Sequence, residues 1–333
     1  MCKKCFIVMI EAIRETLTNQ RVGLGLAALG RPGYMTLTHA TDLPDKTVEA
    51  MRSHAFDMLD FAWKKGIRYF DVARSYGKGE EFLAQWLKSR DISPKEVVIG
   101  SKWGYVYTAN WQVDAEVHEI KYHTPENLAR QWKESQELLG DYLSIYHIHS
   151  ATIESGVLEN TAVLDLLFEI QSTGTVVGLS LTGPKQHKTL EKALTIEQNG
   201  QLLFESVQAT WNLLEQSVAT QLDKARRQGC LIIIKEAMAN GRIATLDPHF
   251  VTASEIATIQ ELSARYQLTP DQLAMNAALQ QEFADIILSG AATESHLLSN
   301  LHRSNEQIDQ NSIEMLAELP EAFWETRSTL SWV

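Results

Sequence analysis

The chain has 333 residues, 44% of them hydrophobic, and a formal net charge of −12 at pH 7. This size and composition allow one large globular domain. The acidic excess argues against nucleic acid or an anionic membrane surface as a partner. No apolar run approaches the ~20 residues that span a bilayer. The apolar segment within the first ten residues is too short for a signal peptide. Three cysteines do not make a disulfide framework, so we expect a cytoplasmic protein.

Residues 1–21 are predicted to be an N-terminal extension that precedes the first strand. Cys2 and Cys5 form a C-x-x-C motif, which is typical of a redox pair or of half a zinc site. A zinc site needs a second pair of ligands, and the sequence has none at a suitable spacing. We therefore interpret this segment as a frayed terminus and expect no metal.

Gly23, Gly25 and Ala28 match the letters of the dinucleotide fingerprint G-x-G-x-x-A. That motif requires a hydrophobic strand before it and a helix that opens at its glycines. The preceding residues 16–21 are polar, and the glycines and proline of 30–33 follow, so a helix cannot begin there. We interpret 22–28 as a strand in its own right.

From residue 22 onward, short apolar runs alternate with amphipathic segments. Strands are predicted at 22–28, 67–72, 97–102, 142–149, 175–181, 206–211, 231–235 and 286–289. Helices are predicted at 46–65, around 82–87, at 125–139, near 160–172, 184–198 and 216–228, across 253–281 and at 294–300. Eight strand–helix units without a break in composition predict a single α/β domain, a (β/α)8 TIM barrel over 22–303. Residues 304–333 are predicted to be a helical tail packed on the barrel.

The one long irregular insertion is 103–123, which follows a strand and therefore lies on the catalytic face of the predicted barrel. It is rich in aromatic residues. We predict that Trp103, Tyr105 and Trp111 contact the substrate, although packing within the loop explains the two tryptophans equally well.

Polar residues end most of the predicted strands. They are Asp71, Lys102, His149, Ser180, Gln208, Lys235 and Ser289. Because parallel strands present their carboxyl ends at one face of a barrel, these residues predict a polar site there. A lysine inside a barrel is costly without a partner, and Asp71 on the neighbouring strand is the obvious one.

Tyr76 lies in the loop after Asp71 and completes a set of residues suited to proton transfer. A tyrosine with an ordinary pKa near ~10 is a poor acid at neutral pH. We expect the Lys102 ammonium to lower that pKa, Asp71 to hold the lysine, and His149 to orient a substrate oxygen. These parts suit carbonyl reduction by hydride from a bound nicotinamide.

The motifs that carry this chemistry occur together in one family. They are Asp71-x-x-x-x-Tyr76-Gly77, Lys102 at the end of the next strand, Tyr146-His-Ile-His149, Val177-Gly-Leu-Ser180, Gln208-x-x-x-Asn212 and the run from Ser289 to Asn300. With this combination the chain resembles the aldo/keto reductase superfamily over about 22–303. The combination is specific, although each motif alone is weak.

The resemblance implies a nicotinamide dinucleotide, with Tyr76 as the acid, Lys102 and Asp71 as its tuning pair, and His149 as the orienting residue. NADPH is expected because most members take it, with NADH as the alternative. The implied cofactor contacts are Ser180, Gln208, Trp211, Lys235, Gly241, Ser289, Gly290, Thr293, His296 and Asn300.

Two positions depart from the family pattern. Leu181 stands where many members have an asparagine that binds the nicotinamide carboxamide, so that hydrogen bond is lost or comes from Thr182 or another group. Ala292 stands where many members have a basic residue facing the 2′-phosphate of NADP. Arg242 is another source of that positive charge.

Two other functions fit parts of the sequence. The first alternative is a regulatory subunit that binds the cofactor without turnover. In that case the four residues of the proton-transfer set serve cofactor binding alone. It is a metal-dependent hydrolase if His147 and His149, which share a strand face, hold a metal, but further ligands are missing at other strand ends. The predicted partners are a small carbonyl or sugar substrate, with no nucleic acid and no membrane, and the chain is predicted to be a monomer or small homo-oligomer.

Overall fold

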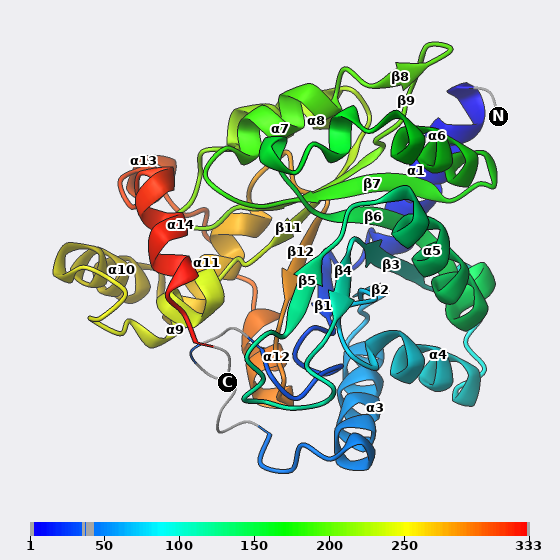
Figure 1. Cartoon of the computed structure of the whole chain (residues 1–333). Helices are drawn as coiled ribbons and strands as arrows, with labels where there is room; N and C mark the ends of the chain where they lie inside the picture. The colour runs from blue at the N-terminus through cyan, green and yellow to red at the C-terminus, as the bar shows by residue number, and fades with distance from the viewer. Residues whose placement is uncertain (1–2, 35–36, 38–42, 332–333) are drawn as a thin grey trace.

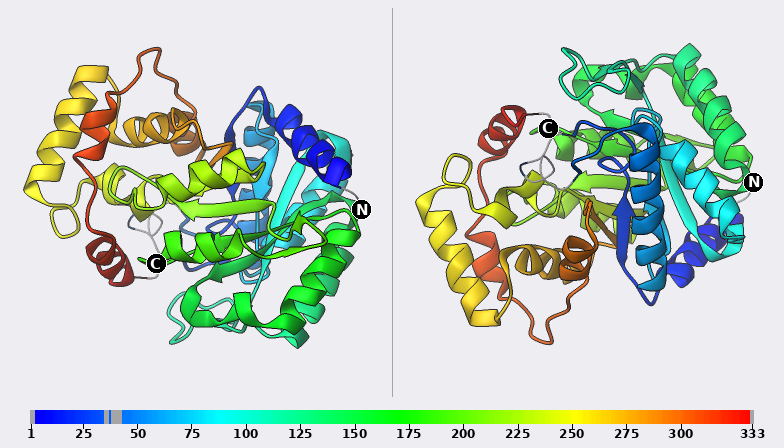
Figure 2. Two further views of the ribbon diagram at one scale, coloured as in Figure 1. Left: turned by 90° about the horizontal axis from the view of Figure 1, so that it is seen from above. Right: turned by 90° about the horizontal axis from the view of Figure 1, so that it is seen from below.

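The computed structural model describes residues 3–34, 37 and 43–331. In this part of the chain, eight parallel strands close into a barrel in the order β1-β12-β11-β10-β7-β6-β3-β2 (Figures 1 and 2). The strands are β1 Val22–Gly25, β2 Tyr69–Asp71, β3 Val98–Trp103, β6 Leu143–Ala151, β7 Val176–Leu181, β10 Ser206–Thr210, β11 Leu231–Lys235 and β12 Ile286–Ser289. The predicted (β/α)8 barrel is confirmed.

Helices surround the strands in the alternation that the sequence predicts. They are α3 Val48–Lys64, α4 Gly79–Ser89, α5 Pro125–Leu139, α6 Thr161–Ser172, α7 Gln186–Ala193, α8 Ala219–Arg227, α10 Ala253–Tyr266, α11 Pro270–Leu279 and α12 Glu294–Asn300. Helix α5 has the predicted bounds because its start is well marked. The Thr124 hydroxyl accepts a hydrogen bond of 3.3 Å from the Asn127 N–H, and proline occupies the first helical position.

Three short pieces of structure differ from the sequence-based expectation. The insertion 103–123 is not irregular throughout, because β4 Tyr105–Tyr107 pairs antiparallel with β5 Glu119–Lys121. Helix α7 ends at residue 193, and β8 Glu197–Gln198 and β9 Gln201–Leu202 form a second small hairpin. A short helix, α9 Arg242–Thr245, follows the loop after β11.

The register of the strands brings their polar ends to one level. Asp71 is aligned with Gly100 on β3, Gln208 of β10 with Ser180 of β7, and Ser289 of β12 with Leu24 of β1. Side chains that follow or end these strands therefore meet at the carboxyl edge of the barrel.

The opposite, amino-terminal end of the barrel is covered by helix α1, Lys3–Leu17. Ile10, Ile13 and Leu17 are buried and belong to one apolar cluster with residues of the barrel strands, including Tyr69 and Ile286. The segment interpreted as a frayed terminus is thus helical from residue 3, and from Ile10 onward the apolar side chains of this helix pack against the barrel. Cys2 lies outside the described residues.

The tail forms two helices, α13 Gln310–Glu314 and α14 Pro320–Ser328. Phe323 and Trp324 of α14 are buried, and the Glu318 N–H before it donates a 2.8 Å hydrogen bond to the carbonyl of Leu214. Helix α14 lies on the same side of the barrel as α9 and α11 (Figure 1).

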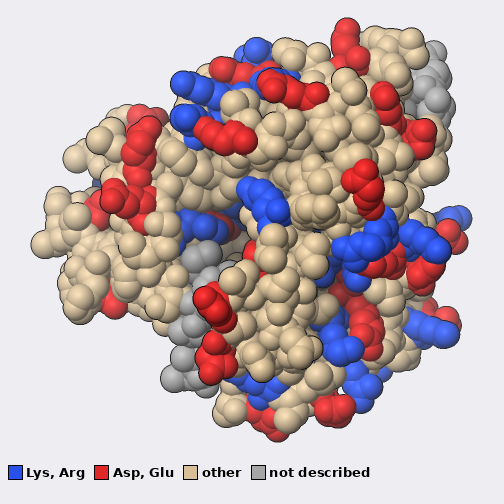
Figure 3. Space-filling view, in the orientation of Figure 1, with Lys and Arg blue, Asp and Glu red and all other residues tan. Residues whose placement is uncertain are grey.

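The surface carries both signs of charge. Figure 3 shows Lys and Arg interspersed with Asp and Glu over the face seen in Figure 1, so the net negative charge is not gathered into one patch on this face. Within the described residues, the structure contains no helix with the length and apolar character needed to cross a membrane.

Because Ile13 is only 6% exposed and packs beneath the barrel, we expect Ile13→Ala to lower the free energy of unfolding by about 2–4 kcal/mol. Urea denaturation measures this change. Glu11→Ala, at an exposed position of the same helix, is the matched control and should change stability by less than about 0.5 kcal/mol. Equal effects of the two variants would show that α1 does not contribute a packed face.

Candidate active site

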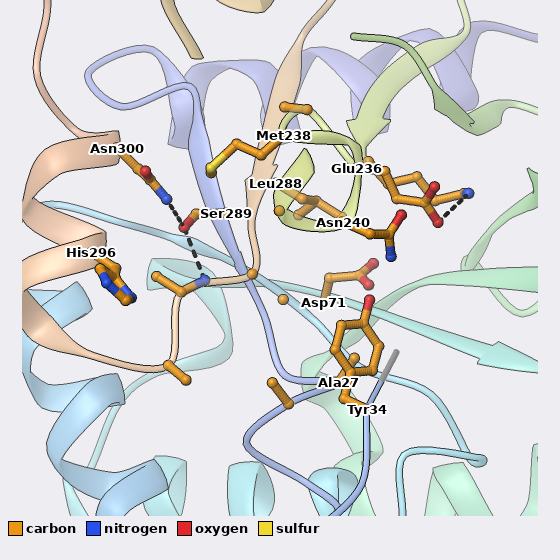
Figure 4. Close-up of a pocket in the computed structure, with 18 of the residues that line it drawn as sticks. Ala27, Tyr34, Asp71, Glu236, Met238, Asn240, Leu288, Ser289, His296 and Asn300 are labelled. Atoms are coloured by element: carbon orange, nitrogen blue, oxygen red, sulfur yellow. Dashed lines mark hydrogen bonds and ion pairs between the residues drawn. The ribbon is translucent and has the colours of Figure 1, made fainter. Parts of the chain in front are cut away.

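A cavity of about 550 Å³ opens at the carboxyl edge of the barrel. Its lining includes six of the seven polar strand-end residues, namely Asp71, His149, Ser180, Gln208, Lys235 and Ser289. Figure 4 shows Asp71 and Tyr34 on one side of the cavity and Ser289, His296 and Asn300 on the other. The cavity is thus one space that several strands and loops form together, and these polar side chains reach it beside apolar ones.

The seventh strand-end residue, Lys102, lies beneath the cavity and pairs with Asp71. The Lys102 and Asp71 side chains are 0% and 3% exposed. The Lys102 Nζ donates to Asp71 Oδ1, to the Val72 carbonyl at 2.9 Å and to the Tyr76 hydroxyl oxygen at 3.5 Å. The lysine therefore joins the carboxylate and the phenol, as expected.

The second oxygen of Asp71 has two further donors. The Gln208 Nε2 donates to Asp71 Oδ2 at 2.7 Å, and the Tyr69 hydroxyl donates to the same atom at 3.3 Å. Gln208 thus positions the carboxylate, and its own carbonyl oxygen can accept a hydrogen bond from a ligand in the cavity.

The pKa of Tyr76 differs from the expectation. Burial, and next the Asp71 carboxylate, raise this pKa well above its ordinary value, while the Arg31 guanidinium opposes the rise. The expected net lowering does not occur, because burial and the Asp71 carboxylate together outweigh the nearby Lys102 ammonium. The phenol is therefore protonated at neutral pH, which is the form a proton donor requires.

His149 faces the cavity as a neutral imidazole. Burial, and then Lys102, lower the pKa of His149 well below its ordinary value. Its Nδ1 lies 3.4 Å from the Ser75 hydroxyl, and its ring centre lies 5.6 Å from that of Tyr76 and 5.0 Å from that of Tyr105. If the Ser75 hydroxyl donates to Nδ1, the Nε2 carries the proton and can donate to a substrate oxygen.

Of the three aromatic residues predicted to contact substrate, Tyr105 alone lines the cavity. Trp103 is 0% exposed and packs edge-on against His123, with ring centres 5.6 Å apart. Trp111 donates from its indole N–H to the Lys46 carbonyl at 2.7 Å, packs edge-on against Phe82 with ring centres 6.3 Å apart, and is not among the residues that line the cavity. The complete burial of Trp103 leaves it no surface for a substrate, whereas Trp111 is half-buried and its assignment stays a prediction.

Eight of the ten residues implied as cofactor contacts line the cavity: Ser180, Gln208, Lys235, Gly241, Ser289, Gly290, His296 and Asn300. Trp211 does not, since it is 1% exposed and packs against Phe283 at 6.1 Å. Thr293 caps helix α12, where its hydroxyl accepts from the His296 N–H at 3.2 Å. These two residues support the site without lining it.

The structure shows the surroundings of the two positions that depart from the family pattern. Thr182 lines the cavity beside the buried Leu181, so it is available for the missing carboxamide contact. Arg242 faces elsewhere, because its Nε donates to the Phe250 carbonyl at 2.9 Å and its Nη2 pairs with Glu318. It therefore does not supply the positive charge that Ala292 lacks.

Sequence reasoning missed the residues that reach the cavity from loops and from the tail, among them Arg31, Tyr34, Glu119, Glu236 and Arg327. The Arg327 Nε of α14 donates to Glu236 Oε2 at 2.8 Å, and the Lys235 Nζ lies 3.4 Å from Glu236 Oε1. Burial raises the pKa of Glu236, but Arg327 and Lys235 outweigh it and lower this pKa to about 2. No periodicity or strand-end signal marks these positions.

The metal-site interpretation of His147 and His149 has no structural support. His147 is fully buried, and its Nε2 lies 3.0 Å from the Ser206 hydroxyl inside the barrel. Across residues 3–34, 37 and 43–331, no group of three or more His, Cys, Asp or Glu side chains is arranged to hold a metal ion.

The sequence of residues 22–321 matches the model of the aldo/keto reductase family. The chain belongs to the aldo/keto reductase family. It is therefore an NAD(P)-dependent oxidoreductase of carbonyl compounds or aldoses.

This aldo/keto reductase has curated relatives of nearly its own length. It is 24% identical to pyridoxal 4-dehydrogenase of Microbacterium luteolum, with 94% of each chain covered. It is 26% identical to D-threo-aldose 1-dehydrogenase of a Pseudomonas species, over 81% of this chain and 85% of the relative. It is 24% identical to the NADH-specific methylglyoxal reductase of Escherichia coli, over 92% and 96%.

Solved structures show the same fold. An aldo-keto reductase from Bacillus halodurans in its holo form superposes with a TM-score of 0.65 at 18% sequence identity, covering 90% of this chain and 92% of that one. Because the two sequences are only 18% identical, this similarity supports the barrel fold alone. The roles of individual side chains depend on the geometry of this aldo/keto reductase.

The buried pair predicts the behaviour of one variant of this aldo/keto reductase. Because Lys102→Met leaves the Asp71 carboxylate buried without its cation, we expect the free energy of unfolding to fall by about 3–5 kcal/mol and activity to collapse. Chemical denaturation and turnover measure the two effects. Lys133→Met, which removes an exposed lysine paired with Glu137 at 3.8 Å, should leave the denaturation midpoint unchanged. A Lys102→Met enzyme that is both stable and active would remove the pair from the mechanism.

Proposed function

We propose that Tyr76 is the general acid of this reductase and that Lys102, Asp71 and His149 position the reacting groups. The observation that carries the proposal is the chain of contacts at the cavity floor, in which the Lys102 Nζ reaches both Asp71 Oδ1 and, at 3.5 Å, the Tyr76 hydroxyl oxygen. Because the lysine donates to the phenol oxygen, the phenol proton is free to point into the cavity. A protonated phenol there can donate to a carbonyl oxygen.

The reaction needs two hydrogen transfers. When bound, the reduced nicotinamide supplies a hydride to the carbonyl carbon. Tyr76 supplies the proton to the carbonyl oxygen, so an alcohol forms and the phenol becomes a phenolate. The Lys102 ammonium stabilises that phenolate, and the neutral His149 holds the substrate oxygen by hydrogen bonding.

The cavity has groups that suit the parts of a nicotinamide dinucleotide. The Ser180 hydroxyl accepts from the Ser150 N–H at 2.8 Å and can still donate its proton to the carboxamide. Gln208 and Thr182 line the same end. Lys235, Arg327 and the loop that ends at Gly241 offer positive charge and backbone groups for the diphosphate. Ser289, His296 and Asn300 lie on the other side (Figure 4) and, with the neighbouring Gly290, suit the adenosine half.

The substrate is proposed to be a small polar carbonyl compound or a sugar. The part of the cavity near Tyr76 is lined by the aromatic rings of Tyr34 and Tyr105 and by the ion pair of Arg31 and Glu119. Aromatic faces with adjacent charged donors and acceptors suit a hydroxylated molecule. Relatives that act on pyridoxal, an aldose and methylglyoxal agree with this class. Panels of aldehydes and aldoses, followed by absorbance of the reduced cofactor, test it, and a preference for long apolar aldehydes contradicts it.

For the compartment and the assembly, we propose a cytoplasmic enzyme that is a monomer or small homo-oligomer. The buried, unpaired thiol of Cys230 is consistent with a reducing compartment. Cell fractionation tests the first statement and sedimentation of the purified enzyme tests the second.

Replacing the acid tests the mechanism directly. Since Tyr76→Phe removes the phenol proton and keeps the ring, we expect turnover to fall by roughly 10²-fold or more while cofactor affinity stays nearly constant. Steady-state rates and a cofactor titration measure both. Tyr142→Phe, which removes a hydroxyl bonded to the Ile92 carbonyl far from the cavity, should retain normal turnover. Near-normal turnover of Tyr76→Phe on a good substrate means the site is wrongly assigned. Absence of turnover by the wild-type chain on every carbonyl, with tight cofactor binding, favours a regulatory barrel.

We propose further that NADPH binds with only modest discrimination, less than ~100-fold over NADH. The 2′-phosphate favours an Arg or Lys, but Ala292 stands at the usual place and Arg242 pairs with Glu318. His296 is exposed and lines the cavity, so it is a position where a permanent charge fits.

His296→Arg should therefore strengthen NADPH binding relative to NADH by roughly tenfold, the effect of one charge-assisted hydrogen bond. Leu298→Arg places the same charge on the same helix at an exposed position outside the cavity lining and should not change the ratio. Quenching of protein fluorescence by each reduced cofactor measures both affinities. If wild-type enzyme binds NADH more tightly than NADPH, the proposed preference is wrong.

A further inference from the structure

Arg31 is buried beside the proposed acid on a segment that cannot move freely. It is 4% exposed and lines the cavity. The backbone before it is pressed against the turn that carries Tyr76: a Cβ on Gly30 would lie 2.5 Å from the Tyr76 carbonyl oxygen, and the Lys78 N–H donates to the Gly30 carbonyl at 2.8 Å. The absence of a side chain at residue 30 therefore permits the close approach of Arg31 and Tyr76.

The guanidinium of Arg31 is held over the phenol ring. Its Cζ lies 5.1 Å from the ring centre of Tyr76 and 5.6 Å from that of Tyr34. Its Nη1 donates to the Ser75 carbonyl at 3.1 Å, one residue before the acid. A cation at this distance favours the phenolate over the phenol.

Glu119 fixes the same guanidinium from another part of the chain. The Arg31 Nη1 donates to Glu119 Oε2 at 2.7 Å, and the two side chains are 3% and 17% exposed. Glu119 belongs to β5, in the hairpin that also brings Tyr105 to the cavity. The hairpin thus places a carboxylate near Tyr76 whose effect opposes that of Arg31.

Other charges also face Tyr76, from elements on several sides of the cavity. Arg31 lowers the pKa of the phenol, whereas burial, Asp71, Glu119 and Glu236 raise it. The neutral His149 packs edge-on against its ring, and the Lys102 Nζ lies 4.9 Å from the ring centre. The groups that face the phenol are Asp71 of β2, Lys102 of β3, His149 of β6, Glu236 after β11, Arg31 after β1, Glu119 of β5 and the hydroxyl of Tyr34.

We propose that Arg31 and Glu119 are a pair of positioning residues that sets how readily Tyr76 gives up and takes back its proton. Arg31 favours the phenolate, and Glu119 limits that effect by neutralising part of the cation. This inference rests on the proposed function, because it requires Tyr76 to be the proton donor. It predicts effects of opposite sign for the two residues.

Alcohol oxidation is the direction in which these effects are visible. In that direction Tyr76 must begin as a phenolate, so below its pKa the rate rises with pH in proportion to the phenolate fraction. Arg31→Gln raises the pKa and shifts this rising line to higher pH, whereas Glu119→Gln lowers the pKa and shifts the line to lower pH.

The experiment measures kcat/KM for oxidation of the alcohol that the wild-type enzyme forms from its best substrate, over the rising part of the pH profile. At each pH, Arg31→Gln is expected to be roughly three- to tenfold slower than wild type and Glu119→Gln roughly two- to threefold faster. Arg31→Lys keeps the charge and should return most of the way to the wild-type line. A gain in rate from Glu119→Gln is not an effect that simple damage to the site produces.

A surface ion pair of the same chemistry provides the matched control. The Arg90 Nη2 lies 2.7 Å from Asp60 Oδ2, and its Cζ lies 5.9 Å from the ring centre of Phe56. Arg90→Gln and Asp60→Asn should leave the pH profile in place.

One result overturns the inference: a Glu119→Gln line that stays in place or moves the same way as that of Arg31→Gln. If thermal melting shows that Arg31→Gln does not fold, the direction of the Glu119→Gln shift decides alone. Failure here is distinguishable from failure of the proposed function. An inactive Tyr76→Phe with unshifted lines removes only the role of the pair, whereas an active Tyr76→Phe removes the proton donor itself.

Discussion

Burial of the Lys102 ammonium is the interaction on which the rest of the site depends. Removing an ammonium and a carboxylate from water costs several kcal/mol per ion, and only close geometry with additional hydrogen bonds offsets that cost. Here Asp71 also accepts from Gln208 and Tyr69, and Lys102 also donates to the Val72 carbonyl. These contacts join β2, β3 and β10 across the barrel, so the chemistry is in place only once the barrel has closed.

The two ends of the barrel have different tasks. At the amino-terminal end, α1 and the first residues of the strands form a purely packed layer around Ile13 and Ile286. At the carboxyl end, the strands stop in polar residues, and the cavity opens there. Stability and chemistry are thus separated along the barrel axis, as is usual for this fold. The closest coupling between them is the Lys102–Asp71 pair, which lies at the boundary between the layers.

The sequence was sufficient for the barrel and for the floor of the site, because both depend on signals that recur locally. An apolar run that ends in a polar residue identified Asp71, Lys102 and His149, and parallel strands bring such ends together whatever the loops do. Arg31, Glu119 and Arg327 carry no such signal. A charged residue in a loop or in the tail looks the same in the sequence whether its side chain lies on the surface or lines a cavity. Trp103 and Trp211 show the opposite difficulty: a large aromatic residue after a strand fits a ligand wall and a packed core equally well, and the sequence does not show the near-complete burial that both have in the structure. The raised pKa of Tyr76 was also beyond the sequence, because it reflects burial and the approach of carboxylates from Asp71, Glu119 and Glu236, which lie far apart in the chain.

The contact between Arg327 and Glu236 has a consequence for how the protein is made. All eight barrel strands precede residue 290 in the chain, whereas Arg327 lies in α14 near its end. A chain emerging from the ribosome therefore contains every strand of the barrel before it contains the last residue of the cavity. Until α14 docks, Glu236 and Lys235 face each other without the second cation, and the loop after β11 lacks its partner. The complete lining of the cavity is thus a late product of synthesis, finished only after every strand of the barrel has been made.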